Sequence, residues 1–137
     1  MPRHPRKPRR LIADGRAYLG TLRHSHSGAG SGRTCRETLT LYPQPAGSGG
    51  PLRIVFTEGP DRYVPGGAPL GSGDVGYIRG ASLNLHEPGA VRALLDAASA
   101  CGWQPEGRRA VEVDGWSLLE TAAAARAEAN GPAGPEE

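Results

Sequence analysis

The stretch PGAVRALLDAASACGWQP, residues 88–105, carries the strongest structural signal in the chain. Its apolar side chains recur at the spacing of one helix face, namely at Val91, Leu94, Leu95 and Ala98. Pro88 suits a first helical turn, because its missing N–H is not needed there. Gly102 stands where a left-handed residue commonly ends a helix, and Pro105 prevents continuation. The sequence therefore predicts an amphipathic helix over residues 88–101 that packs on a sheet.

Upstream of this helix, apolar and polar residues alternate in several short runs, as they do in half-buried strands. Residues 11–13 and 16–19 flank Asp14-Gly15, which favours a two-residue hairpin turn because both residues tolerate a positive φ. We expect the second strand to reach Leu22 or His24, with a Gly/Ser loop over residues 25–33. Further strands are predicted at residues 35–42, 52–57, 75–78, 83–85 and 111–113.

Two structures compete after Asp114-Gly115. Ser117 and Glu120 fit a capping box that opens a helix over residues 118–129. Alternatively, Asp114-Gly115 turns a hairpin with residues 116–119 as its return strand. The alanine-rich run that follows favours the helix.

The predicted fold class is therefore α+β, with an antiparallel sheet of about four or five strands. One amphipathic helix packs on this sheet, and the C-terminal helix is the weaker element. The 137 residues suffice for about one domain, and 21 glycines and 13 prolines indicate much loop around its core. We expect residues 9–129 to form that domain, between a disordered basic arm over residues 1–8 and a disordered tail over residues 130–137.

The positive charge is concentrated at the start of the chain. Five of the 16 basic residues lie in the first ten positions, and the rest of the chain carries 11 basic and 14 acidic residues. These five cations are candidate phosphate contacts: Arg3, Arg6, Lys7, Arg9 and Arg10. The slightly acidic remainder argues against a duplex-binding body.

The sequence shows no export signal and no apolar run near the roughly 20 residues of a membrane span. Cys35 and Cys101 lie far apart and form no C-x-x-C pair. We therefore expect a cytoplasmic protein with reduced thiols and no membrane association.

No catalytic constellation is visible in the sequence. Residues 71–76 match G-x-G-x-x-G, but a dinucleotide site needs a helix to open at its end, and a strand-like Tyr77-Ile78 follows instead. No serine lies in a G-x-S-x-G turn. The sequence predicts no enzyme, no catalytic residue and no cofactor.

His24 and His26 are spaced as neighbours on one strand face and could present two imidazoles to a metal ion. Further ligands would have to come from His4, His86 or a carboxylate, and nothing in the sequence fixes these in place. We therefore expect no metal site.

The Gly/Pro-rich segment 58–81 is long for a loop inside a small domain, and such loops are often functional. Within it, Asp61, Arg62 and Tyr63 form a candidate partner-binding loop. Trp103 and Trp116 are expected in the core, because the chain has few other aromatic residues.

Three motifs together carry a resemblance: Asp-Gly-Arg-x-Tyr at residues 14–18, Pro-Gly-x-Val-Arg-x-Leu-Leu at 88–95 and Gly-Trp-x-Pro at 102–105. The chain resembles, over residues 10–105, a group of small uncharacterised proteins from GC-rich bacteria such as actinobacteria. This resemblance implies a sheet with a packed helix, and it supplies no activity, cofactor or site residue.

Two functions remain as hypotheses. The first is a non-enzymatic binding or accessory protein that presents a sheet face or the long loop to a protein partner. The alternative is weak nucleic-acid binding through the basic N-terminal arm.

Overall fold

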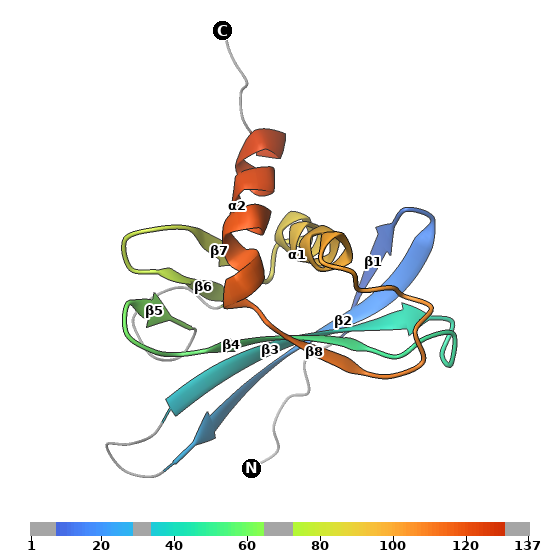
Figure 1. The fold of residues 1–137 in the computed structure, drawn as a ribbon, viewed down its shortest axis with the longest axis horizontal. Coiled ribbons are helices and arrows are strands. Elements are labelled where there is room, and N and C mark those ends of the chain that lie inside the picture. Colours follow the sequence, from blue (N-terminus) through green and yellow to red (C-terminus); the bar gives the residue numbers. More distant parts are fainter. Residues whose placement is uncertain (1–7, 29–33, 65–72, 131–137) are drawn as a thin grey trace, which may run out of the picture.

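The computed structural model describes residues 8–28, 34–64 and 73–130. Its main feature is a five-stranded sheet in the order β1-β2-β3-β4-β8, with both helices on one face (Figure 1). The strands are β1 (Arg9–Ala13), β2 (Arg16–Ser27), β3 (Thr34–Gln44), β4 (Leu52–Thr57) and β8 (Val111–Asp114). The helices are α1 (Pro88–Ala100) and α2 (Trp116–Asn130). The α+β class and the mainly antiparallel sheet are confirmed.

A second, three-stranded sheet forms within and after the predicted long loop. It consists of β5 (Arg62–Tyr63), β6 (Asp74–Tyr77) and β7 (Ser82–Asn84), paired antiparallel in that order. The predicted strands at 75–78 and 83–85 correspond to β6 and β7, whereas β5 was not predicted. Residues 65–72 lie outside the described part of the chain.

The first hairpin turns at Asp14-Gly15 as predicted, with φ of 53° and 78° at the two residues. Positive φ at both central residues is the mark of a type I′ turn, whose twist matches the right-handed twist of the two strands. β2 then runs to Ser27, beyond the predicted end, and pairs with β3 over eleven residue pairs from Ala17↔Gln44 to Ser27↔Thr34. This long β2–β3 hairpin projects past the rest of the sheet in Figure 1.

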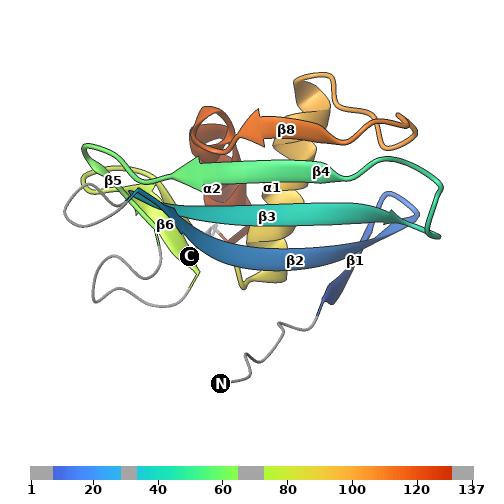
Figure 2. The same cartoon turned by 90° about the horizontal axis from the view of Figure 1, so that it is seen from below.

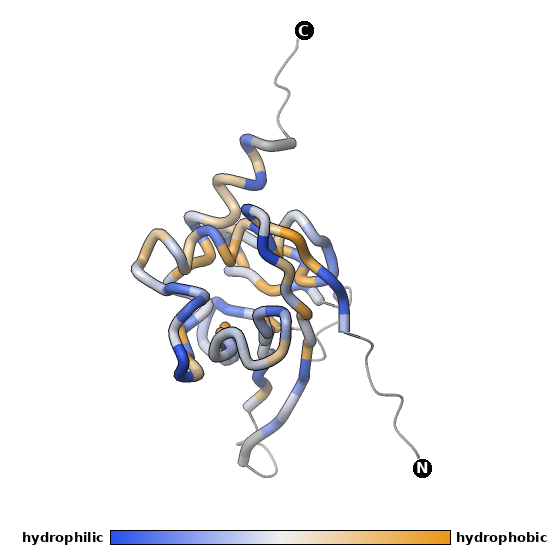
Figure 3. The backbone as a smooth tube through the Cα atoms, turned by 90° about the vertical axis from the view of Figure 1, so that its right-hand side faces the viewer, coloured by the Kyte–Doolittle hydropathy of each residue, from blue (hydrophilic) through white to orange (hydrophobic). Residues whose placement is uncertain are grey.

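The core lies between the sheet and the two helices. The inner-face residues of the two central strands are almost completely buried, namely Leu39, Leu41, Leu52, Ile54 and Phe56. Leu94 of α1 and Leu119 of α2 are fully buried against them. Hydrophobic stretches accordingly occupy the middle of the molecule, and hydrophilic ones dominate its turns and ends (Figure 3).

Helix α1 begins at Pro88, as predicted, and ends at Ala100, one residue earlier than expected. Cys101 caps it, and Gly102 follows with φ of 110°. The Trp103 N–H donates to the Ala98 carbonyl at 3.0 Å, which closes the last turn. The start, the apolar face and the end of this helix therefore follow from local sequence.

One strand pair departs from the predicted antiparallel arrangement, because β8 pairs parallel to β4, from Leu52↔Val111 to Val55↔Asp114. A parallel neighbour requires a long crossover connection. Here the small sheet and α1 supply that crossover, since the chain passes over the inner face before it returns beside β4 (Figure 2).

The return strand considered for residues 116–119 is wrong, since Trp116 already belongs to α2. The helix begins two residues earlier than predicted, because the Asp114 carboxylate accepts the Trp116 N–H at 3.1 Å. A side chain at Gly115 would meet the Phe56 ring at 2.5 Å, so the turn between β8 and α2 has room only for glycine.

Helix α2 reaches Asn130, one residue into the predicted tail, and residues 131–137 lie outside the described chain. The predicted arm is likewise outside it, apart from Pro8. Neither described helix is long and apolar enough to cross a membrane.

Candidate functional site

The face of the large sheet opposite the helices is covered by no described element. Figure 2 looks onto this face, with α1 and α2 behind the strands. Because side chains alternate along a strand, the residues between the buried core positions point outward here. We call this surface the outer sheet face.

The register arranges the outward residues of β1 to β4 in rows across the strands, and each of four successive rows contains one arginine. The rows are Arg10–Leu19–Tyr42, Thr21–Thr40–Arg53, Arg23–Thr38–Val55 and Ser25–Arg36–Thr57. Successive rows stand about 7 Å apart, because two residues of a strand separate them. The four arginines therefore form a cationic ladder across the face.

The arginines of this ladder are exposed, and none forms an ion pair or a side-chain hydrogen bond with any described residue. The arginines on the helix side behave differently. Arg16 pairs with Glu106, Arg92 bridges Asp14 and Asp96, and Arg126 contacts Glu87 at 2.9 Å. These three arginines are thus paired with carboxylates, whereas the four arginines of the ladder are not.

Hydroxyl groups and one aromatic ring accompany the ladder. Thr21 and Thr38 are half-buried beside it, and Tyr42 is exposed by 40% in the same row as Arg10. The acidic residues on the outer sheet face lie on β8, at its far edge, where Glu112 is the cross-strand neighbour of Arg53 and Asp114 that of Val55.

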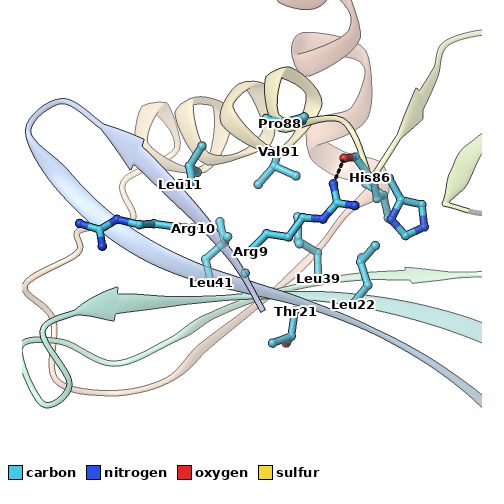
Figure 4. A pocket seen from close by; sticks show the side chains of 12 residues that line it. Arg9, Arg10, Leu11, Thr21, Leu22, Leu39, Leu41, His86, Pro88 and Val91 are labelled. Carbon is cyan, nitrogen blue, oxygen red and sulfur yellow. Dashed lines mark hydrogen bonds between the residues drawn. The ribbon is translucent and has the colours of Figure 1, made fainter. Parts of the chain in front are cut away.

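A pocket of about 330 Å³ opens on the other side of the sheet, between β1 and the start of α1 (Figure 4). Its lining is mostly apolar and comes from four elements and the segment before α1. The apolar lining residues are Leu11, Leu22, Leu39, Leu41, Leu85, Pro88 and Val91. This size and character match small binding pockets in other proteins, which start at about 300 Å³.

Arg9 crosses the mouth of this pocket. Its guanidinium donates a hydrogen bond of 2.7 Å to the His86 carbonyl oxygen (Figure 4). Arg10 points away from the pocket in the same view, because neighbouring residues of a strand face opposite sides.

The five candidate phosphate contacts are therefore not one group. Arg3, Arg6 and Lys7 lie outside the described residues. Arg9 lies at the apolar pocket, and Arg10 lies on the outer sheet face. Three further members of the ladder, Arg23, Arg36 and Arg53, were not singled out in the sequence.

The candidate partner loop has a structural role in the fold. Arg62 lies over the rings of Tyr77 and Trp116, at 5.9 and 5.2 Å from their centroids. Asp61 has φ of 65°, and its carbonyl accepts the Ile78 N–H. Asp61 and Arg62 are exposed and Tyr63 is half-buried, so the segment keeps accessible surface beside these contacts.

Trp103 and Trp116 are buried, as expected. The described part of the G-x-G-x-x-G match, residues 73–76, runs into strand β6 rather than into a helix, so it lacks the helix N-terminus that a dinucleotide pyrophosphate needs.

Comparison with known proteins gives no family: no family model, no curated protein and no solved structure matches this chain.

Proposed function

We propose that this protein is a non-enzymatic cytoplasmic protein that binds single-stranded nucleic acid on its outer sheet face. The observation that carries the proposal is the ladder of four exposed arginines, one in each of four successive rows, none of which forms an ion pair with a described residue.

The chemistry of the face fits a polyanion. Guanidinium groups bind phosphates through two parallel hydrogen bonds, and hydroxyl groups such as that of Thr21 are common further phosphate contacts. The exposed Tyr42 ring offers a surface on which an unpaired base can stack. An unpaired arginine gains these contacts without first breaking an ion pair of its own.

A single strand fits this surface better than a duplex. Base reading in a duplex requires a helix or a ribbon that enters the major groove, and the outer sheet face presents neither. Single strands instead bind along positively charged surfaces that carry aromatic rings. The basic arm, with Arg3, Arg6 and Lys7, would add cations to the same electrostatic attraction.

The test is fluorescence anisotropy of a labelled single strand at several salt concentrations. We expect the triple variant Arg23→Ala, Arg36→Ala, Arg53→Ala to lower affinity at least tenfold. The slope of log affinity against log salt should fall in magnitude by about 2, since each cation lost contributes about 0.7 for single strands.

A matched control removes the same charge elsewhere, by Arg79→Ala, Arg108→Ala and Arg109→Ala. These three arginines are exposed and lie outside the strands. Equal losses in the two triple variants would show that only net charge matters, and no binding at low salt would refute the proposal.

The apolar pocket favours a second candidate, binding of a protein partner. β1 is an edge strand whose second side pairs with no described strand. An extended peptide can add to such an edge while one of its side chains enters an adjacent pocket. Arg9 and Arg10 would complement acidic residues in that peptide. The proposed occupant is thus an extended acidic peptide with one large apolar residue.

Selection from a phage-displayed random peptide library provides defined probes for this candidate. Peptides that use the pocket should lose about tenfold or more in affinity for a Val91→Phe variant, because the larger ring fills the space. Val111→Phe makes the same change on β8 at the opposite edge, and it should leave affinity unchanged. Peptides that bind both variants equally would exclude the pocket.

A further inference from the structure

Three side chains with metal-binding atoms meet at the projecting end of the β2–β3 hairpin, on the inner face of the sheet. The register places His24 opposite Glu37 and His26 opposite Cys35. One ring nitrogen of each histidine and the Cys35 Sγ all lie within 4.8 Å of one another. The two imidazoles stand edge to face, with their centroids 4.7 Å apart.

We propose that His24, His26 and Cys35 bind a divalent transition metal ion, with zinc as the first candidate. Thiolate and imidazole are the ligands that zinc prefers in proteins. Three protein ligands leave a fourth position for water or an external ligand, as in zinc sites that carry out chemistry.

The contacts of His24 support this assignment. Its Nδ1 lies 2.9 Å from a carboxylate oxygen of Glu37, whose side chain is almost fully buried. Metal-binding histidines characteristically donate their second ring N–H to a carboxylate, which fixes the ring and leaves the other nitrogen for the ion. That other nitrogen, Nε2, is buried and has no hydrogen-bond partner among the described residues.

A buried nitrogen that lacks a partner is costly, because it has lost water without gaining a hydrogen bond. Coordination to a metal ion would satisfy it. Glu37 would then be a positioning residue, which orients His24 and supplies negative charge close to the cation.

Cys35 is held in place through its backbone. Its N–H donates to the Glu58 carboxylate at 2.9 Å, and its carbonyl accepts the Glu58 N–H at 2.9 Å. The Cys35 Sγ lies 3.2 Å from Nδ1 of His26. This is close to the roughly 3.5 Å expected between sulfur and nitrogen on one tetrahedral zinc ion.

The His26 side chain can move so that the three ligand atoms come together around one ion. It is exposed, so its ring can rotate to bring all three ligand atoms to zinc-binding separations. The third histidine with a described position, His86, lies at the apolar pocket and belongs to a different part of the molecule.

This proposal departs from the expectation that the sequence holds no metal site. That expectation rested on the lack of a fixed third ligand beside His24 and His26. Cys35 is that ligand, and only the pairing of β2 with β3 places it there.

The test is titration of the reduced, full-length protein with cobalt(II). Cobalt(II) replaces zinc in proteins, and it gives a charge-transfer absorption band when a thiolate coordinates it. We expect one cobalt ion per chain, that band, visible bands typical of tetrahedral geometry, and displacement of cobalt by zinc. Zinc should also raise the Tm of the wild-type protein.

Variants identify the ligands. Cys35→Ser should abolish the charge-transfer band, and His26→Gln should weaken cobalt binding at least tenfold. Since His26 is exposed, that second variant tests the site even if Cys35→Ser fails to fold. Glu37→Gln should weaken binding by about tenfold to a hundredfold, the usual effect of removing a carboxylate that orients a ligand.

Cys101→Ser and His86→Gln are the matched controls, and both should bind cobalt as the wild type does. A wild-type protein without the charge-transfer band would overturn the proposal, as would a band that survives in Cys35→Ser. Rapid alkylation of Cys35 that zinc does not slow would also overturn it, and would point to a thiol activated by His26 instead.

Discussion

The Arg9 guanidinium and the His86 backbone carbonyl are joined by a hydrogen bond of 2.7 Å, across 77 positions of the chain. This contact ties the first strand of the sheet to the segment that leads into α1. Arg9 is the first residue of β1, so the bond holds the start of that strand against the segment before α1.

Removing residues 1–8 should leave the fold intact. Arg9 keeps its bond to His86, and the hairpin β1–β2 retains all five of its residue pairs. Thermal melting and an amide NMR spectrum of the truncated protein would check this. A wide change in core amide shifts would show that the arm is part of the fold.

The same truncation should weaken binding of single-stranded nucleic acid without abolishing it. It removes Arg3, Arg6 and Lys7, so the salt slope should fall in magnitude by about 2. The ladder on the outer sheet face should account for the remaining slope. Complete loss of binding in the truncated protein would assign the site to the arm alone.

Gly102→Ala should destabilise the protein by about 1–2 kcal/mol. An added Cβ would meet nothing within 4 Å, so the cost comes from φ of 110°, which side chains other than hydrogen disfavour. Gly59→Ala also has open space but no positive φ, and should change stability by no more than about 0.5 kcal/mol. Urea unfolding of both variants would separate backbone strain from packing.

Leu94→Ala should cost about 2–5 kcal/mol, because the Leu94 side chain is completely buried between α1 and the sheet. Ile12→Ala is the control, since Ile12 is 55% exposed and should lose about 0.5 kcal/mol or less. Equal unfolding free energies for the two variants would contradict the packing of α1 on the sheet.

Burial raises the pKa of the Tyr18 phenol above its ordinary value of 10.0. Below pH 10 the phenol is neutral in both the folded and the unfolded state. As the pH rises from 10 through the raised pKa, the unfolded state loses the proton first, so folding becomes less favourable. Ultraviolet titration should show one late-ionising tyrosine in the wild type that is missing in Tyr18→Phe, and alkaline stability should fall less steeply in that variant.

Local sequence determined the elements whose signals are local. The hairpin at Asp14-Gly15 follows from two residues that accept positive φ, and α1 follows from its apolar spacing, Pro88 and Gly102. The order of the strands could not be read in this way. The parallel entry of β8 depends on the path of the chain over the core, which no stretch of residues 111–114 encodes.

The candidate sites show the same division. Alternation along each strand already places His24 and His26 on one side, and Arg23 and Arg36 on the side opposite the buried residues of their strands. Which residues meet across strands depends on register, and a shift by one residue would reverse every face. The register of β2 against β3 is the one that buries apolar side chains of both strands on the core face. Only the tertiary structure could therefore bring Cys35 to the two histidines and align four arginines in successive rows.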